Sequence, residues 1–175
     1  MILPQFLTTL AVSLAATPLV RLLALRHGFV ARPTSDRWHR RPTALLGGVA
    51  VFLATVAAVV VGGLPPGPLR AIGAGAVLVF LVGLVDDVLS LSPVAKLSWQ
   101  VVAASLAVWG GAALGWTESL TLDALLTIFW LIGVTNAFNL IDNMDGACAG
   151  VGSIAALSLA AIAWLAPGGH PAGAA

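Results

Sequence analysis

The sequence has few charged residues, a single cysteine and no tyrosine. Only 9% of its 175 residues are Asp, Glu, Lys or Arg, whereas a soluble globular domain averages about 25%. The chain therefore cannot cover a water-facing surface, which excludes an ordinary soluble enzyme, and we expect no nucleic-acid partner. One cysteine, Cys148, cannot form an intrachain disulfide, and no Cys/His spacing indicates a zinc site.

Apolar sequence is abundant instead. Hydrophobic residues make up 59% of the chain, and the mean hydropathy is +1.03. With about 20 apolar residues per crossing, the sequence predicts an all-α, polytopic membrane helical bundle that forms a single transmembrane domain over residues 1–175. The first apolar segment has no basic region before it and exceeds the roughly 7–15 residues of a signal-peptide core, so we expect it to be retained. The six expected spans lie near residues 3–25, 44–63, 69–86, 97–115, 122–140 and 148–166.

The distribution of basic residues predicts the orientation. The loop after the third expected span contains Lys96, and the loops on the opposite side contain only Arg70. Positively charged loops stay in the cytoplasm, so the N-terminus is expected outside. This orientation places every polar cluster of the chain on the cytoplasmic face of the plasma membrane. The loop after the first expected span holds most of the basic residues, namely Arg26, Arg32, Arg37, Arg40 and Arg41.

An acidic pair lies at the end of the third expected span, in "GLVDDVLSLSPVAKLSWQ", residues 83–100. The adjacent carboxylates of Asp86 and Asp87 repel each other unless a cation or a proton intervenes. One or two carboxylates, completed by water and substrate phosphates, are typical of a magnesium site. The alternative is an acidic pair that only ends a span in the headgroup region, and the pair alone does not decide between the two.

Lys96 follows at the start of the next expected span. Its ammonium group could neutralise a phosphate or could simply extend to the membrane interface. Ser92 and Pro93, a few residues earlier, have the pattern of a helix start, with serine as N-cap and proline in the first turn.

A second polar cluster occupies "NAFNLIDNMDGACAG", residues 136–150, directly after the apolar run "LLTIFWLIGV". Such groups are costly in lipid. A continuing helix would bring Asn136, Asn139 and Asn143 onto one face, with Asp142 and Asp145 outside that stripe and the helix ending near Gly146. Amides and carboxylates together can hydrogen-bond a base or ribose and can also bind metal. The alternative is a polar helix end without a ligand.

Together with "HRRPTALLGG", residues 39–48, these clusters resemble the polyprenyl-phosphate N-acetylhexosamine-1-phosphate transferase family, glycosyltransferase family 4. The compact "DDVLSLSPVAKL" spacing resembles the N-acetylglucosamine branch more than the phospho-N-acetylmuramoyl-pentapeptide branch. The resemblance implies a magnesium-dependent enzyme, with Mn²⁺ as the alternative ion. In such an enzyme undecaprenyl phosphate attacks the β-phosphate of a UDP-amino sugar such as UDP-N-acetylglucosamine. The reaction releases UMP and starts a cell-envelope glycopolymer such as lipopolysaccharide or teichoic acid.

The resemblance also implies roles for individual residues. By motif position, Asp86 and Asp87 would be catalytic and metal-binding, with one of them assisting deprotonation of the lipid phosphate, and Lys96 would contact phosphate. The residues implied to bind the nucleotide are Arg40, Asn136, Asn139, Asp142 and Asp145.

The sequence departs from the family in length and in detail. The family usually has glycine at the position of Asn143 and Leu-Ala at the positions of Ala147 and Cys148. It also has about ten or eleven spans, a later Gly-Asp motif and a histidine-rich loop. We therefore expect this chain to represent the N-terminal half of the family fold and to be inactive alone, with a homodimer or a second chain supplying the missing half.

Two functions of other classes remain open on the sequence. Acidic and amide groups at membrane depth are also found in transporters of polar or anionic solutes. Transport carboxylates, however, are expected near the bilayer midplane, whereas those of this chain lie at the expected span ends. A non-catalytic membrane scaffold is the other alternative.

Overall fold

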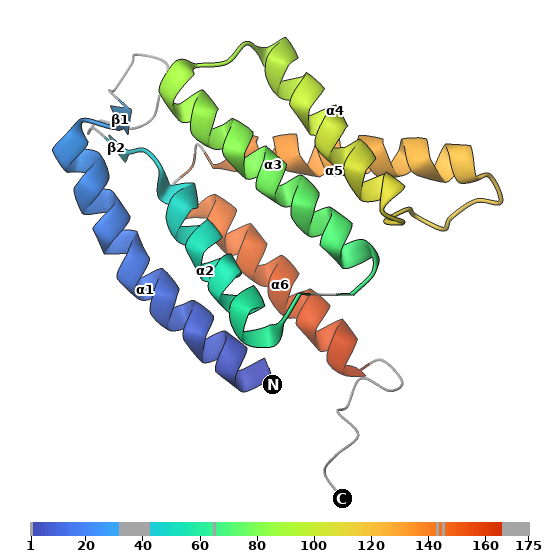
Figure 1. Ribbon diagram of the computed structural model, residues 1–175, viewed down its shortest axis with the longest axis horizontal. Coiled ribbons are helices and arrows are strands. Elements are labelled where there is room, and N and C mark those ends of the chain that lie inside the picture. Colours follow the sequence, from blue (N-terminus) through green and yellow to red (C-terminus); the bar gives the residue numbers. More distant parts are fainter. Residues whose placement is uncertain (1, 32–42, 65, 143, 145, 166–175) are drawn as a thin grey trace, which may run out of the picture. The chain divides into compact units, whose positions relative to one another are not determined.

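The computed structural model describes residues 2–31, 43–64, 66–142, 144 and 146–165. The chain divides into two compact units, Met1–Gly133 and Val134–Ala175, and each is described by itself. Within the described residues, the helices are α1 (Ile2–His27), α2 (Gly47–Gly62), α3 (Pro68–Leu89), α4 (Pro93–Trp109), α5 (Leu120–Ile141) and α6 (Ala147–Leu165) (Figure 1).

The helical membrane fold is confirmed. Among the residues that the structure describes, three helices are long and apolar enough to cross a membrane, namely Leu3–His27 of α1, α3 and α5. Two shorter apolar helices are α2 and residues Ala147–Ile162 of α6. The number of crossings, the outside N-terminus and the single transmembrane domain stay predictions.

One short strand pair accompanies the helices. Strand β1 (Val30–Ala31) pairs antiparallel with β2 (Thr43–Ala44), and Val30 lies opposite Ala44. The Leu45 backbone N–H also donates to the Phe29 carbonyl at 2.9 Å. This pairing places Ala31 opposite Thr43, a strand contact that the all-helical prediction did not include.

Helices α1 and α2 of the first unit pack against each other (Figure 1). Gln5 on α1 donates a hydrogen bond from Nε2 to the Ala58 carbonyl on α2 at 3.5 Å. A Cβ atom at Gly62 would collide with the same Gln5 side chain. A glycine is therefore what lets this polar side chain lie against α2.

Helices α3 and α4 also lie side by side (Figure 1). A Cβ atom at Gly75 on α3 would lie 2.8 Å from the Ala103 carbonyl oxygen on α4, and one at Gly110 would collide with Ala71. The buried residues of α4 are all alanines. Small residues at a helix contact allow close backbone approach, which is the usual way membrane helices pack, while large apolar side chains such as Leu97 and Val102 are exposed.

Gly75→Ala is expected to destabilise this helix pair, because the new methyl group would meet backbone rather than a side chain that could move. Overpacking of this kind costs about 1–3 kcal/mol. Gly73→Ala on the same helix is the matched control, since a Cβ there meets nothing within 4 Å and alanine is the better helix former. Unfolding of both variants in mixed micelles with rising sodium dodecyl sulfate measures the difference. Equal stability of the two variants would contradict the close packing at Gly75.

Three helix ends, two of α4 and one of α5, can be compared with the expectations from the sequence. Helix α4 begins as predicted, with the Ser92 hydroxyl accepting from the Ala95 N–H at 3.2 Å and proline in the first turn. It ends at Trp109 rather than near residue 115, because Gly111 has a φ of +92° that the helix cannot contain. Helix α5 ends at Ile141, so the expectation that it continues to Gly146 is wrong; Gly146 instead has a φ of +74° just before α6.

Candidate active-site residues

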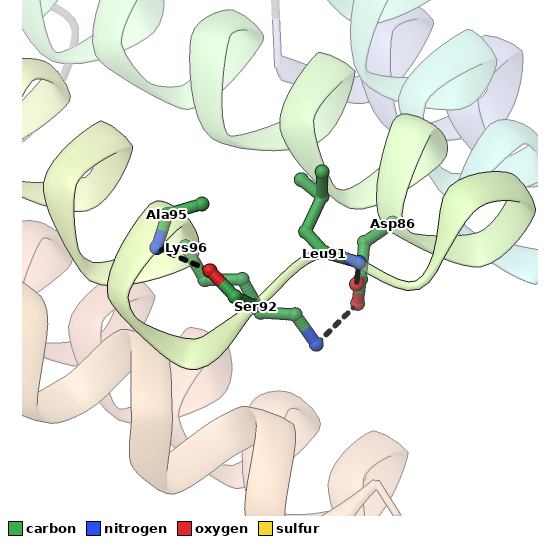
Figure 2. Close-up of polar contacts among 5 residues, drawn as sticks. All are labelled: Asp86, Leu91, Ser92, Ala95 and Lys96. Atoms are coloured by element: carbon green, nitrogen blue, oxygen red, sulfur yellow. Dashed lines mark hydrogen bonds and ion pairs between the residues drawn. The ribbon is translucent and has the colours of Figure 1, made fainter.

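Asp86 lies in the last turn of α3, and its side chain turns over the connection to α4. One carboxylate oxygen, Oδ1, accepts from the Leu91 N–H at 2.9 Å, and the other, Oδ2, lies 2.7 Å from Lys96 Nζ (Figure 2). The Asp86 backbone carbonyl accepts from the Ser90 N–H at 2.9 Å. Ser90 has a φ of 51°, so a left-handed residue ends α3 and lets the chain reverse toward α4. Asp86 thus holds this reversal with both its backbone and its side chain.

Lys96 contributes the matching charge from the first turns of α4. The N-cap Ser92 fixes where α4 begins, and the Ser92 carbonyl accepts from the Lys96 N–H at 3.1 Å. The Lys96 and Asp86 side chains are 36% and 26% exposed, so the ion pair is open to water on one side. From the sequence, Lys96 was expected to contact phosphate or to extend to the membrane interface, and its pairing with Asp86 was not predicted.

Asp87 is placed differently from Asp86. Successive residues on a helix project about 100° apart, and Asp87 is exposed whereas the Asp86 carboxylate is directed to the connection (Figure 2). The acidic pair is therefore asymmetric. The cation that the sequence analysis required between two adjacent carboxylates is supplied, at Asp86, by Lys96.

The described residues contain no group of three or more His, Cys, Asp or Glu side chains that could hold a metal ion by themselves. Magnesium, however, is commonly bound by one or two carboxylates while waters and substrate phosphates complete the shell. Asp87, an exposed residue next to Asp86, fits that share of a magnesium site. The carboxylates of this site therefore suit a magnesium ion that is bound together with the phosphates of the substrate.

The second cluster belongs to the second unit. Asn136 and Asn139 are exposed on α5, and residues three apart are neighbours on a helix surface. Asp142 follows the helix, is also exposed, and its backbone N–H still donates to the Phe138 carbonyl at 3.0 Å. The Asp142 carboxylate lies close to the thiol of Cys148 on α6. The sequence analysis gave Cys148 no role; its place six residues after an aspartate is the only signal that could have suggested one.

The structure brings together some of the predicted residues. It pairs Asp86 with Lys96 in the first unit, and it places Asn136, Asn139 and Asp142 in consecutive turns of the second. Two predicted nucleotide-binding residues, Arg40 and Asp145, lie outside the described residues.

Comparison with known proteins gives the family. The model of glycosyl transferase family 4 matches residues 69–174, a range that contains both polar clusters. The chain is 33% identical over 168 residues to a Bacillus subtilis protein named "Probable undecaprenyl-phosphate N-acetylglucosaminyl 1-phosphate transferase", covering 90% of this chain and 47% of that protein. It is 35% identical over 174 residues to the decaprenyl-phosphate N-acetylglucosaminephosphotransferase of Mycobacterium tuberculosis H37Rv, covering 87% and 43%.

A third relative carries a different name. The phospho-N-acetylmuramoyl-pentapeptide-transferase of Synechococcus sp. RCC307 is 36% identical over 164 residues, covering 79% of this chain and 45% of that protein. The chain therefore spans less than half the length of these relatives. No solved structure matches it. Because the family match covers more than half of the chain, this membrane protein belongs to glycosyl transferase family 4.

Proposed function

We propose that this chain forms the N-terminal half of an enzyme that transfers N-acetylglucosamine-1-phosphate from UDP-N-acetylglucosamine to undecaprenyl phosphate at the cytoplasmic face of the plasma membrane. The observation that carries the proposal is the Asp86–Lys96 ion pair beside the exposed Asp87, within the range that the family matches. The names of the Bacillus and Mycobacterium relatives support the sugar and the lipid class. The product would start a cell-envelope glycopolymer.

In the proposed reaction a phosphate oxygen of the lipid attacks the β-phosphorus of the sugar nucleotide. The bond from that phosphorus to the oxygen bridging the two phosphates breaks, and UMP leaves. Phosphoryl transfer requires mainly that the protein aligns the phosphates and offsets their charge. Lys96, which the Asp86 carboxylate holds at 2.7 Å, is a fixed cation that can offset phosphate charge during transfer.

Asp87 would help to bind the metal ion that offsets the remaining negative charge of the phosphates. Its exposed carboxylate would bind magnesium together with the substrate phosphates, and Asp86 would complete or position that site. A bound magnesium or manganese ion would supply charge neutralisation at the transferring phosphate. The lipid phosphate is already ionised for the most part at neutral pH, so removal of its remaining proton is the most that either carboxylate would need to do.

The second cluster would bind the nucleotide. Asn136 and Asn139 offer both donors and acceptors, and Asp142 offers acceptors only, which suits the hydroxyl groups of a ribose and the imide edge of uracil. The nearby thiol of Cys148 would help to position the Asp142 carboxylate. Arg40 and Asp145 would add to this group.

A chimera tests the proposal. Residues 1–175 replace the matching N-terminal part of the Bacillus subtilis relative, of which this chain covers 47%, and the remainder of that relative supplies the other half. With undecaprenyl phosphate, magnesium and radiolabelled UDP-N-acetylglucosamine, membranes containing the chimera are expected to form a labelled lipid diphosphate. The remainder of the relative alone is the matched control and is expected to form none.

The 175-residue chain without a second half is expected to form no product in the same assay. Product formed by this chain alone would show that residues 1–175 suffice for transfer, and a membrane-inserted chimera without activity would count against the proposed transfer reaction. The Synechococcus relative's name makes UDP-N-acetylmuramoyl-pentapeptide the second donor to test. Faster transfer from that donor would assign the chain to the phospho-N-acetylmuramoyl-pentapeptide branch of the family.

A further inference from the structure

Asp123 is a buried carboxylate that the proposed reaction does not use. It lies in the first turn of α5, at the end of α4 remote from Lys96, and is only 4% exposed. Its Oδ1 atom accepts three hydrogen bonds: from the Thr117 N–H and the Thr117 hydroxyl, each at 3.0 Å, and from the Trp116 N–H at 3.3 Å. A buried carboxylate needs such partners, and here they all come from the connection between α4 and α5.

Thr127, one turn further along α5, adds a second tie. Its hydroxyl donates to the Asp123 carbonyl at 2.6 Å and accepts from the Leu114 N–H at 2.9 Å. At the other side of the connection, the Ala112 N–H donates to the Ala107 carbonyl of α4 at 3.0 Å. The connection is therefore fixed to both helices by hydrogen bonds that are costly to leave unmade when buried.

This fixed connection presents two tryptophans outward. Trp109, the last residue of α4, is 87% exposed, and Trp116 is 68% exposed. Leu120, the first residue of α5, is exposed as well. Tryptophan side chains with an apolar body and one N–H donor concentrate at the two membrane interfaces. Two exposed indoles on a connection that is held by hydrogen bonds are typical of a segment at such an interface.

The length of α4 bears on the depth of Trp109 in the membrane. Its 17 residues span about 25 Å, close to the thickness of roughly 30 Å of a hydrocarbon core. Helix α4 is not among the three described helices that are long and apolar enough to cross a membrane by themselves. With its N-cap Ser92 at one interface, however, a helix of this length would place Trp109 close to the other.

We propose that residues 109–120 form an interfacial anchor, in which Asp123 and Thr127 fix the connection so that the indoles of Trp109 and Trp116 lie between the acyl chains and the lipid headgroups. The partner is the lipid interface at the α4–α5 end of the first unit, which the predicted orientation makes the outer leaflet. This proposal is independent of the proposed transfer reaction.

Fluorine NMR of the chain in lipid nanodiscs tests the proposed depth. The chain is labelled with fluorotryptophan, and the variants Trp109→Phe and Trp116→Phe assign the two resonances. A nitroxide lipid labelled next to its headgroup is expected to broaden both resonances more than a lipid labelled at the end of its acyl chain or a water-soluble paramagnetic chelate. Strongest broadening of either resonance by the acyl-end label or the chelate would overturn the proposal.

The role of the buried carboxylate is tested with two variants. In Asp123→Ala the Trp116 resonance is expected to become broadened by the water-soluble chelate, while the Trp109 resonance, on α4 itself, stays unchanged. Asp123→Asn retains an acceptor oxygen and is expected to keep Trp116 at its depth. Unchanged broadening of Trp116 in the alanine variant would refute the positioning role. If that variant does not insert, Thr127→Val gives the same comparison, because it removes the acceptor of the Leu114 N–H and the donor to the Asp123 carbonyl but leaves the Asp123 carboxylate in place.

Discussion

Asp87→Asn in the chimera is expected to lower the transfer rate about 100- to 1,000-fold, the usual cost of losing one electrostatic group at a reacting centre. Asparagine has nearly the same shape as aspartate but carries no charge, and the position is exposed. Exposed substitutions usually change the free energy of unfolding by less than about 0.5 kcal/mol. The expected result is therefore a large loss of rate at almost constant stability, measured as initial rates and as unfolding in mixed micelles.

The magnesium dependence of the same variant separates two roles of Asp87. If Asp87 binds the ion, a higher magnesium concentration is needed for half-maximal rate and excess magnesium restores part of the activity. If Asp87 instead removes a proton, the pH profile changes while the magnesium requirement stays the same. Glu118→Gln, which removes an exposed carboxylate from the connection between α4 and α5, is the matched control and should retain the rate. If Asp87→Asn retains the wild-type rate, Asp87 is not part of the active site.

The helices were largely predictable because hydropathy alone indicates long apolar segments. Their ends were not, because single residues decide them. The beginning of α4 was predicted correctly from Ser92 and Pro93, whose side-chain chemistry is local. The end of α4 at Trp109 could not be predicted, because "AALG" continues the apolar pattern beyond Gly111 and composition does not report a backbone φ of +92°.

The prediction for the acidic pair Asp86–Asp87 was limited in a similar way. The sequence analysis selected Asp86, Asp87 and Lys96, yet it treated the two carboxylates as equivalent. Their asymmetry depends on the reversal at Ser90, which brings a lysine ten residues further along the chain to 2.7 Å from Asp86. Such a contact depends on the conformation of the connection, whereas hydropathy and motif spacing describe only order along the chain.

Asp123, unlike Asp86 and Lys96, was not selected from the sequence at all. No role was predicted for it from the sequence. In the structure its three hydrogen bonds to Trp116 and Thr117 organise a whole connection. The spacing from Thr117 to Asp123 fits no common capping pattern, so the sequence contained no strong signal for this contact.

Lys96→Met is the second substitution with a large expected effect, because it removes both the cation for the phosphate and the partner of Asp86. The rate is expected to fall about 100- to 1,000-fold. The ion pair is partly exposed, and pairs of this kind contribute at most about 1 kcal/mol to stability, so unfolding cannot account for the loss. Lys96→Arg keeps the charge but changes its shape and is expected to retain part of the rate.

A double-mutant cycle shows whether Asp86 and Lys96 act as one unit. If Asp86 serves by holding Lys96, Asp86→Asn and Lys96→Met each disable the same element, and the double variant loses no more than the worse single variant, as residues acting together are not additive. If the two act separately, their losses multiply. Lys96 is the only lysine of the chain, so the NMR signal of its dimethylated amine reports the pair directly. A signal that Asp86→Asn leaves unchanged, together with multiplied rate losses, would show that the pair does not position Lys96.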